Sequence, residues 1–205
     1  MAKMDRTERI RTLKAFDSLY PGFLAGMDEV GRGPLAGDVV TACVILPRES
    51  QILWVDDSKR LSEYRREKVY DEIMSEALFV GIGRRTPGEI DTMNILEATK
   101  AAMRQAAADA RADVFLIDAV TALGLSGREV SVIHGDANSY AIAAASIVAK
   151  VTRDREMRQL DALYPEYGFA RNKGYGTAEH IAALRKYGPC PIHRRSFISH
   201  FTGKS

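Results

Sequence analysis

The 205-residue sequence has only two cysteines, Cys43 and Cys190, and they lie far apart in the chain. Two distant thiols cannot build a disulfide framework or a zinc knuckle, so we expect them to pack as small hydrophobic side chains in a reducing cytoplasm. The sequence also has no apolar run of roughly eighteen residues, and its charged first segment, MAKMDRTERIRTLKAF, has no apolar signal-peptide core. We therefore expect a cytoplasmic protein with no membrane partner.

Composition is that of an ordinary globular chain, but charge is distributed unevenly, with a basic excess near the C-terminus. Hydrophobic residues make up 46% and charged residues 27%, and the length suits one domain that can bury a core without a structural metal. Net charge is only +2, yet residues 165–205 hold seven basic and two acidic side chains. This asymmetry indicates either a polyanion-binding end or a solvated basic face. Nothing in the sequence indicates an oligomer, so we expect a monomer.

Hydrophobic periodicity predicts an α/β domain with a mixed sheet and a helical C-terminal part. The segment VFLID at 114–118 is typical of a short buried strand that runs parallel to a neighbour. The loop 165–176 is the one long segment without periodicity, and such loops are often functional. Strands are expected at 23–27, 38–46, 78–83 and 114–118, and helices at about 10–20, 70–77, 94–111, 138–163 and 177–188.

Four carboxylates lie at the ends of these elements: Asp28 and Glu29 after the first strand, Asp118 after VFLID, and Asp136 before the long helix. Such a cluster, without histidine or thiolate, suits Mg²⁺ or Mn²⁺. Two ions about 3.5–4 Å apart could activate water and stabilise a departing oxygen. The alternative is that the acids cap helices or face solvent. Adjacent strand residues point to opposite faces, so Asp28 and Glu29 can share one site only if the flanking glycines permit a bend.

A glycine-rich turn, Gly31-Arg32-Gly33-Pro34, follows the first two acids directly. It lacks the lysine and hydroxyl of a Walker loop, which argues against binding of a nucleoside triphosphate. Its backbone N–H groups could approach a phosphate or a sugar closely, and Arg32 could add a bidentate contact. A simple tight turn between two strands is the alternative.

Eight separated segments together resemble the bacterial ribonuclease HII family. They agree with the family in order, spacing and identity over about residues 24–198, and they are GMDEVGRGPLAG, DDSKRLSE, PGEIDTMNILEAT, FLID, HGD, AAASIVAKVTRDREM, YGFARNKGYGT and HRRSF. The resemblance implies a ribonuclease H-like α/β fold, in which helices flank a mixed β-sheet and a small helical extension follows at the C-terminus. It implies a catalytic body over about 1–164 and a basic substrate-binding part over about 165–205.

The resemblance also implies the activity. Members of this family are metal-dependent endonucleases that cut 5′ to ribonucleotides embedded in duplex DNA and cut RNA–DNA hybrids, leaving 5′-phosphate and 3′-hydroxyl ends. The metal-binding and catalytic acids carry over to Asp28, Glu29, Asp118 and Asp136, and the junction-reading turn to Gly31, Arg32 and Gly33. Tyr175 matches the tyrosine that stacks on the deoxyribose after the ribonucleotide. Expected further substrate contacts are Lys59, Ser146, Lys150, Lys173, Arg194 and Arg195.

Three positions depart from the family pattern without removing a metal ligand: Ala119, His134 and Ala143 stand where glycine, lysine and serine are common. Two rival functions remain open. One is a nucleic-acid binding module that has lost turnover, which would show salt-sensitive binding without cleavage. The other is a structure-selective DNA nuclease, which keeps the acids but does not read a 2′-hydroxyl.

Overall fold

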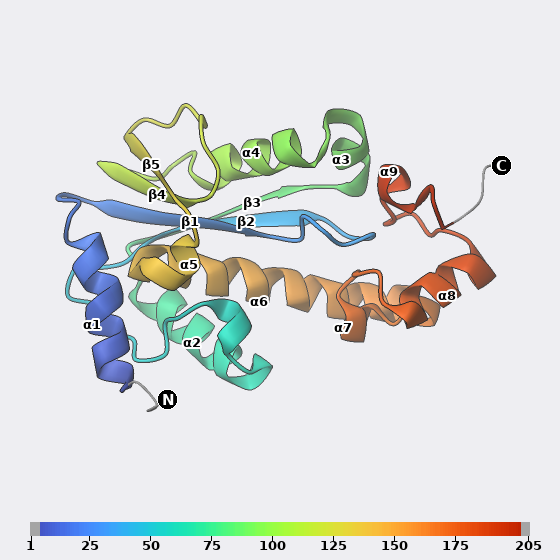
Figure 1. Ribbon diagram of the computed structural model, residues 1–205, viewed down its shortest axis with the longest axis horizontal. Coiled ribbons are helices and arrows are strands. Elements are labelled where there is room, and N and C mark those ends of the chain that lie inside the picture. The colour runs from blue at the N-terminus through green and yellow to red at the C-terminus, as the bar shows by residue number, and fades with distance from the viewer. Residues whose placement is uncertain (1–4, 202–205) are drawn as a thin grey trace.

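One mixed sheet of five strands lies between two layers of helices, and further helices extend beyond one end of it (Figure 1). The computed structural model describes residues 5–201. The strands are β1 (Leu24–Val30), β2 (Val39–Ile45), β3 (Phe79–Arg85), β4 (Val114–Asp118) and β5 (Arg128–Val132). The helices are α1 (Arg6–Asp17), α2 (Glu63–Glu76), α3 (Pro87–Met93), α4 (Ile95–Ala106), α5 (Gly135–Asn138), α6 (Tyr140–Leu163), α7 (Phe169–Asn172), α8 (Ala178–Tyr187) and α9 (Arg195–Ile198), with 3₁₀ turns η1 (Ser58–Arg60) and η2 (Pro165–Tyr167).

The strand order is β3-β2-β1-β4-β5. The first three strands form an antiparallel meander, whereas β4 pairs in parallel with both β1 and β5. The parallel pairing expected of 114–118 is therefore confirmed. Because β1 and β4 run in the same direction, their carboxyl ends lie at the same edge of the sheet, and Asp28 and Asp118 lie near those ends.

Each face of the sheet has its own apolar core. Helix α6 covers β1 and β2 on one face, supported by α1 and α2, and α4 covers β2 and β3 on the other (Figure 1). The start of α6 contacts β1 very closely, because a Cβ added to Gly26 would lie 2.0 Å from the carbonyl carbon of Ala141. Gly26 therefore permits helix contact rather than a bend, and β1 keeps its pairing with β2 through Val30.

The C-terminal part is helical, as expected, and packs at one end of the molecule (Figure 1). Its small core joins Tyr167 and Phe169 to Ala36 of the glycine-rich turn and to Met157 of α6. The segment 165–176, expected as a loop, contains η2 and α7 and then turns through the left-handed residues Lys173 and Gly174. Within residues 5–201, no helix combines the length and the apolarity needed to cross a bilayer.

Candidate active site

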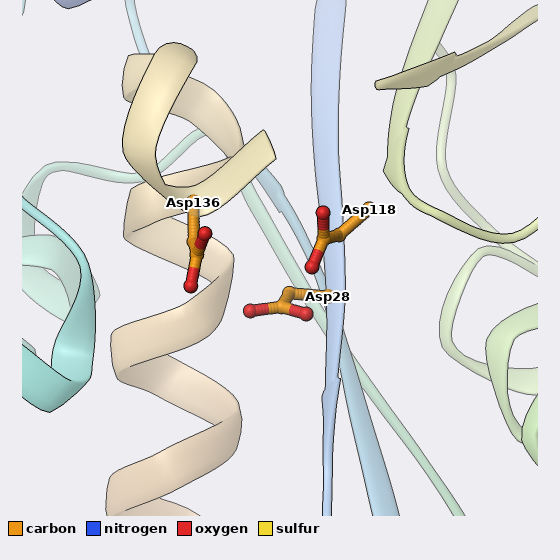
Figure 2. Close-up of side chains that lie close together, drawn as sticks. All are labelled: Asp28, Asp118 and Asp136. Carbon is orange, nitrogen blue, oxygen red and sulfur yellow. The ribbon is translucent and has the colours of Figure 1, made fainter. Parts of the chain in front are cut away.

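Three of the four predicted acids converge at the carboxyl edge of the parallel strands. Asp28 faces α6 from β1, Asp118 ends β4, and Asp136 comes from the short helix α5. One carboxylate oxygen from each lies within 4.8 Å of the others. Figure 2 shows the three side chains directed toward one another from two strands and one helix.

Local backbone contacts hold this arrangement in place. The Gly135 N–H donates to Asp118 Oδ1 at 2.7 Å, which ties the end of β4 to the start of α5. Two left-handed residues, Ala119 (φ 48°) and His134 (φ 55°), flank this connection and turn the chain sharply on either side of it. Ala119 stands where the family commonly has glycine, and its positive φ gives the physical reason for that preference.

Glu29, the fourth predicted acid, directly follows Asp28 on β1. The strand is regular here, so Asp28 and Glu29 alternate, and Glu29 is outside the three-carboxylate group. Its Oε1 accepts from Arg32 Nη1 at 3.3 Å, while its Oε2 is buried and has no hydrogen-bond partner among residues 5–201. Its charge nevertheless acts on Asp28, so Glu29 lies near the three converging carboxylates without being one of them.

The electrostatics of the cluster favour a bound cation. Burial, the Glu29 charge and the Asp118 charge raise the pKa of Asp28 well above its ordinary value. Burial also raises the pKa of Asp118, against the Gly135 hydrogen bond, and raises the pKa of Glu29, against the attraction of Arg32. Clustered, desolvated carboxylates of one sign are costly unless a cation is shared among them.

The donor set also fits a particular kind of ion. Each of the three converging residues offers a carboxylate oxygen, with no imidazole or thiolate among them. Oxygen-only sets of this kind suit hard divalent cations. The Asp28, Asp118 and Asp136 carboxylates therefore fit a Mg²⁺ or Mn²⁺ site.

Lys59 is the basic side chain nearest to this cluster among the predicted contacts. Its Nζ lies 3.4 Å from Asp136 Oδ2, and its side chain is 80% exposed. Partial burial lowers the pKa of Lys59, but the attraction of Asp136 and Asp57 outweighs it and raises the pKa overall. Lys59 thus stays charged beside Asp136, with most of its side chain exposed.

The glycine-rich turn and Tyr175 lie together. A Cβ built on Gly33 would be 3.8 Å from Tyr175 Cε1, and Tyr175 is 43% exposed. Arg32 links this turn to the acids through its contact with Glu29. The structure thus brings Gly33 and Tyr175 beside each other and joins the turn to Glu29 through Arg32.

The remaining predicted contacts differ in how available they are. Ser146 is buried and donates to Ser58 Oγ at 2.8 Å, and Lys150 is mostly buried and bonded to Asp154 at 2.7 Å. Lys173 Nζ donates to the Ala170 carbonyl at 2.7 Å. Arg195 is exposed at the start of α9, where its backbone N–H binds Asp91.

Arg194 requires a correction. It was expected to contact phosphate, but it is 0% exposed, and its guanidinium donates to the carbonyls of Gly31, Arg32 and Gly37. In this structure it is not available to a phosphate and instead supports the glycine-rich turn. Sequence reasoning also passed over Arg153, which is equally buried and contacts the same turn. Its neighbours in AAASIVAKVTRDREM include Lys150, Asp154, Arg155 and Glu156, so no local signal distinguishes it from an exposed helix residue.

The fold and the carboxylate site define a class of protein: a metal-dependent nuclease with a ribonuclease H-like α/β fold. The family model of ribonuclease HII matches residues 25–200. The chain belongs to the ribonuclease HII family. It is therefore an endoribonuclease that acts on RNA within RNA/DNA substrates.

Individual relatives support this family assignment. The chain is 52% identical over 198 residues to ribonuclease HII of Lachnoclostridium phytofermentans, covering 95% of this chain and 78% of that protein. It is 54% identical over 176 residues to ribonuclease HII of Enterococcus faecalis, covering 85% and 69%. Among solved structures, ribonuclease HII in the PCNA complex from Archaeoglobus fulgidus superimposes with a TM-score of 0.77 at 26% identity, covering 89% of this chain and 98% of that one.

Proposed function

We propose that this enzyme nicks duplex DNA on the 5′ side of an embedded ribonucleotide, and cuts RNA–DNA hybrids, leaving 5′-phosphate and 3′-hydroxyl ends. The observation that carries this proposal is the convergence of Asp28, Asp118 and Asp136; the pairing of Gly33 with Tyr175 supports it. The turn and the tyrosine would distinguish the sugar at the cut, because RNA differs from DNA by its 2′-hydroxyl.

The acids would hold the cofactor. Asp28, Asp118 and Asp136, with Glu29 beside them, would bind two Mg²⁺ or Mn²⁺ ions. When bound, such ions supply an activated water and stabilise the departing 3′-oxygen. The protein's own task is to hold the carboxylates and to align the scissile phosphate with them. The Gly135 N–H fixes Asp118 for this task, and Lys59 at the open side would attract the phosphate.

Sugar discrimination falls to the turn and the tyrosine. RNA differs from DNA by its 2′-hydroxyl, and backbone groups of a glycine-rich turn can bond that hydroxyl because no side chain intervenes. The half-exposed Tyr175 ring offers a flat surface to the following deoxyribose, and an added hydroxyl there would be disfavoured. Arg32, Lys173 and Arg195 would contact the phosphate backbone, which positions the duplex without reading its sequence.

We further propose that residues 165–205 form the substrate-binding part on a catalytic body of residues 1–164, and that the enzyme acts as a monomer. The basic excess of 165–205 and the placement of Tyr175 within it support this division. Both cysteines are free and buried, which suits the cytoplasm that we propose as its compartment.

The test is cleavage of a labelled duplex with one internal ribonucleotide, beside its all-DNA twin and an RNA–DNA hybrid, with Mg²⁺, Mn²⁺ or EDTA. We expect metal-dependent cutting 5′ to the ribonucleotide and none of the all-DNA duplex. Cutting of both duplexes would favour the structure-selective DNA nuclease, and salt-sensitive binding without cutting would favour the binding module.

A variant pair assigns the chemistry. Asp136→Asn should lower the rate by about 100-fold or more while binding persists, because it removes a charged ligand from the cluster. The exposed Asp109→Asn is the matched control and should cut like wild type. Equal rates for Asp136→Asn and wild type would contradict the role given to Asp136.

A further inference from the structure

Arg153 and Arg194 are the two largest side chains that are fully buried, and both contact the segment that follows β1. Within residues 5–201, neither guanidinium has a carboxylate oxygen within 4.0 Å, and both bond to backbone carbonyls instead. Burying a cation without a paired anion is costly, and an apolar side chain of similar size would avoid that cost. Such an arrangement points to a positional role.

Arg153 joins two segments that are distant in the sequence. Its Nε donates to the Asp38 carbonyl at 2.9 Å and its Nη2 to the Ala36 carbonyl at 3.0 Å, both in the glycine-rich segment. Its Nη1 donates to the Lys173 carbonyl at 2.8 Å, two residues before Tyr175. A planar guanidinium can make these three bonds at once, whereas a lysine ammonium in the same space cannot match their geometry.

The two segments are fitted around this side chain. Gly31 has a φ of +94°, and a Cβ there would lie 2.4 Å from Arg153 Nε. The Leu35 N–H also donates to the Gly174 carbonyl at 2.8 Å. As a result of this packing, Gly33 lies close to the Tyr175 ring: a Cβ on Gly33 would be in van der Waals contact with Tyr175 Cε1, at 3.8 Å.

We infer that Arg153 is a positioning residue that fixes Tyr175 relative to Gly33 and thereby sets the preference of the enzyme for ribonucleotide–deoxyribonucleotide junctions over continuous RNA. This inference rests on the proposed function. Arg153 touches no substrate in this role: it acts through the turn and the tyrosine. A continuous RNA–DNA hybrid has no deoxyribose after the cut ribonucleotide, so its cleavage depends less on that spacing.

The test compares Arg153→Lys with wild type on two substrates, the single-ribonucleotide duplex and a hybrid with continuous RNA. We expect kcat/KM on the junction to fall by about tenfold and on the hybrid by less than about twofold, because only one alignment is lost. Arg155→Lys is the matched control, since Arg155 lies on the same helix in a surface ion pair with Glu67. It should leave both values unchanged.

A double-mutant cycle separates positioning from general support. In a Tyr175→Ala background there is no ring to position, so adding Arg153→Lys should change the junction-to-hybrid ratio by less than about twofold. A full tenfold effect in that background would overturn the inference. Equal losses on both substrates in folded Arg153→Lys, or no loss on either, would also overturn it.

A second variant tests the same spacing without disturbing the buried cation. Gly33→Ala has space for its methyl group but places it against the Tyr175 ring, so it should fold and lower the junction-to-hybrid ratio. An unchanged ratio would overturn the inference even if Arg153→Lys failed to fold. A wild-type enzyme that cuts neither substrate would remove the proposed function, whereas wild-type cutting with unchanged variant ratios would remove the inference alone.

Discussion

The Nε2 atoms of His180 and His193 lie 3.0 Å apart in the interior of the C-terminal part. His180 Nδ1 faces the Tyr175 carbonyl at 2.8 Å, and His193 Nδ1 accepts from the Cys190 N–H at 3.0 Å. One consistent proton arrangement follows, in which His193 Nε2–H donates to His180 Nε2 and His180 Nδ1–H donates to Tyr175. Both rings are neutral in this arrangement, because a proton on His180 Nε2 would face the His193 Nε2–H and a proton on His193 Nδ1 would face the Cys190 N–H.

This pair predicts acid sensitivity. Burial and the neighbouring His180 lower the pKa of His193 to about 4 from an ordinary 6.5. The unfolded state therefore binds protons first as pH falls, so the contribution of His193 to stability is complete above pH 6.5 and is lost toward pH 4. Between pH 7.5 and pH 5 the free energy of unfolding should drop by about 1–2 kcal/mol more in wild type than in His193→Gln.

Urea unfolding at the two pH values measures this difference. Burial raises the pKa of Asp17 to about 6, so its titration changes stability in the opposite direction. Asp17 is common to wild type and His193→Gln, so the comparison between them cancels its contribution. An equal pH dependence in the two proteins would contradict the neutral pair.

Repulsion among the clustered carboxylates should lower the free energy of unfolding of the metal-free protein. Asp28→Asn keeps an oxygen for the Glu29 N–H, which Asp28 Oδ1 accepts at 2.7 Å, and removes one of three like charges. Because the pKa of Asp28 is raised in the folded state, wild type loses stability as pH rises through it, and the advantage of the variant grows with pH.

Thermal unfolding in EDTA at pH 8 should show Asp28→Asn to be more stable than wild type by about 1 kcal/mol or more. Adding Mg²⁺ or Mn²⁺ should raise the melting temperature of wild type and do so much less for Asp28→Asn, since the ion binds the folded site. The exposed Asp109→Asn serves as the control. Metal stabilisation of equal size in Asp28→Asn would contradict a site built on Asp28.

Ala119 gives a prediction about backbone strain. Its φ of 48° is unfavourable for a residue with a Cβ, and it directly follows Asp118. Ala119→Gly should stabilise the protein by a few tenths to about 1 kcal/mol, because relief of that strain exceeds the added entropy of the unfolded chain. The control is Ala107→Gly at φ −93°, which should destabilise. A loss of stability in Ala119→Gly, measured by urea unfolding, would contradict this explanation.

The sequence carried enough information to predict where the acids gather, because strand ends are local features and VFLID is typical of a parallel strand. The sequence did not predict β5, because its apolar and polar residues alternate only weakly. Of the residues of β5, only Val132 is buried. The face of Glu29 could be foreseen only as a conflict between alternation and a shared site. The pairing of β1 with β2 is unbroken through Val30, so Asp28 and Glu29 alternate along the strand, and a role for Glu29 at the metal site stays a prediction.

The buried arginines mark a different limit. Arginine is almost never fully buried unless it is paired, so sequence reasoning places it on the surface and assigns it to phosphate. For Arg194 this assignment was wrong in the present structure, because its partners are carbonyls more than 150 residues earlier in the chain. No local pattern specifies backbone acceptors at that distance. Only the three-dimensional path of the 31–38 segment reveals them.

The position of Lys59 predicts a change in the salt dependence of substrate binding. Its ammonium is exposed yet lies 3.4 Å from Asp136, so it can neutralise a substrate phosphate at the edge of the cluster without leaving its position. A lysine that contacts one phosphate releases about one counterion on binding. In EDTA, the slope of log affinity against log salt for the ribonucleotide-containing duplex should therefore be shallower by about 1 in Lys59→Gln than in wild type. Fluorescence anisotropy between about 50 and 200 mM salt measures that slope.

The control is Lys68→Gln, because Lys68 is an exposed lysine on α2, and it should keep the wild-type slope. An unchanged slope in Lys59→Gln would mean that Lys59 serves Asp136 alone and does not contact the substrate backbone.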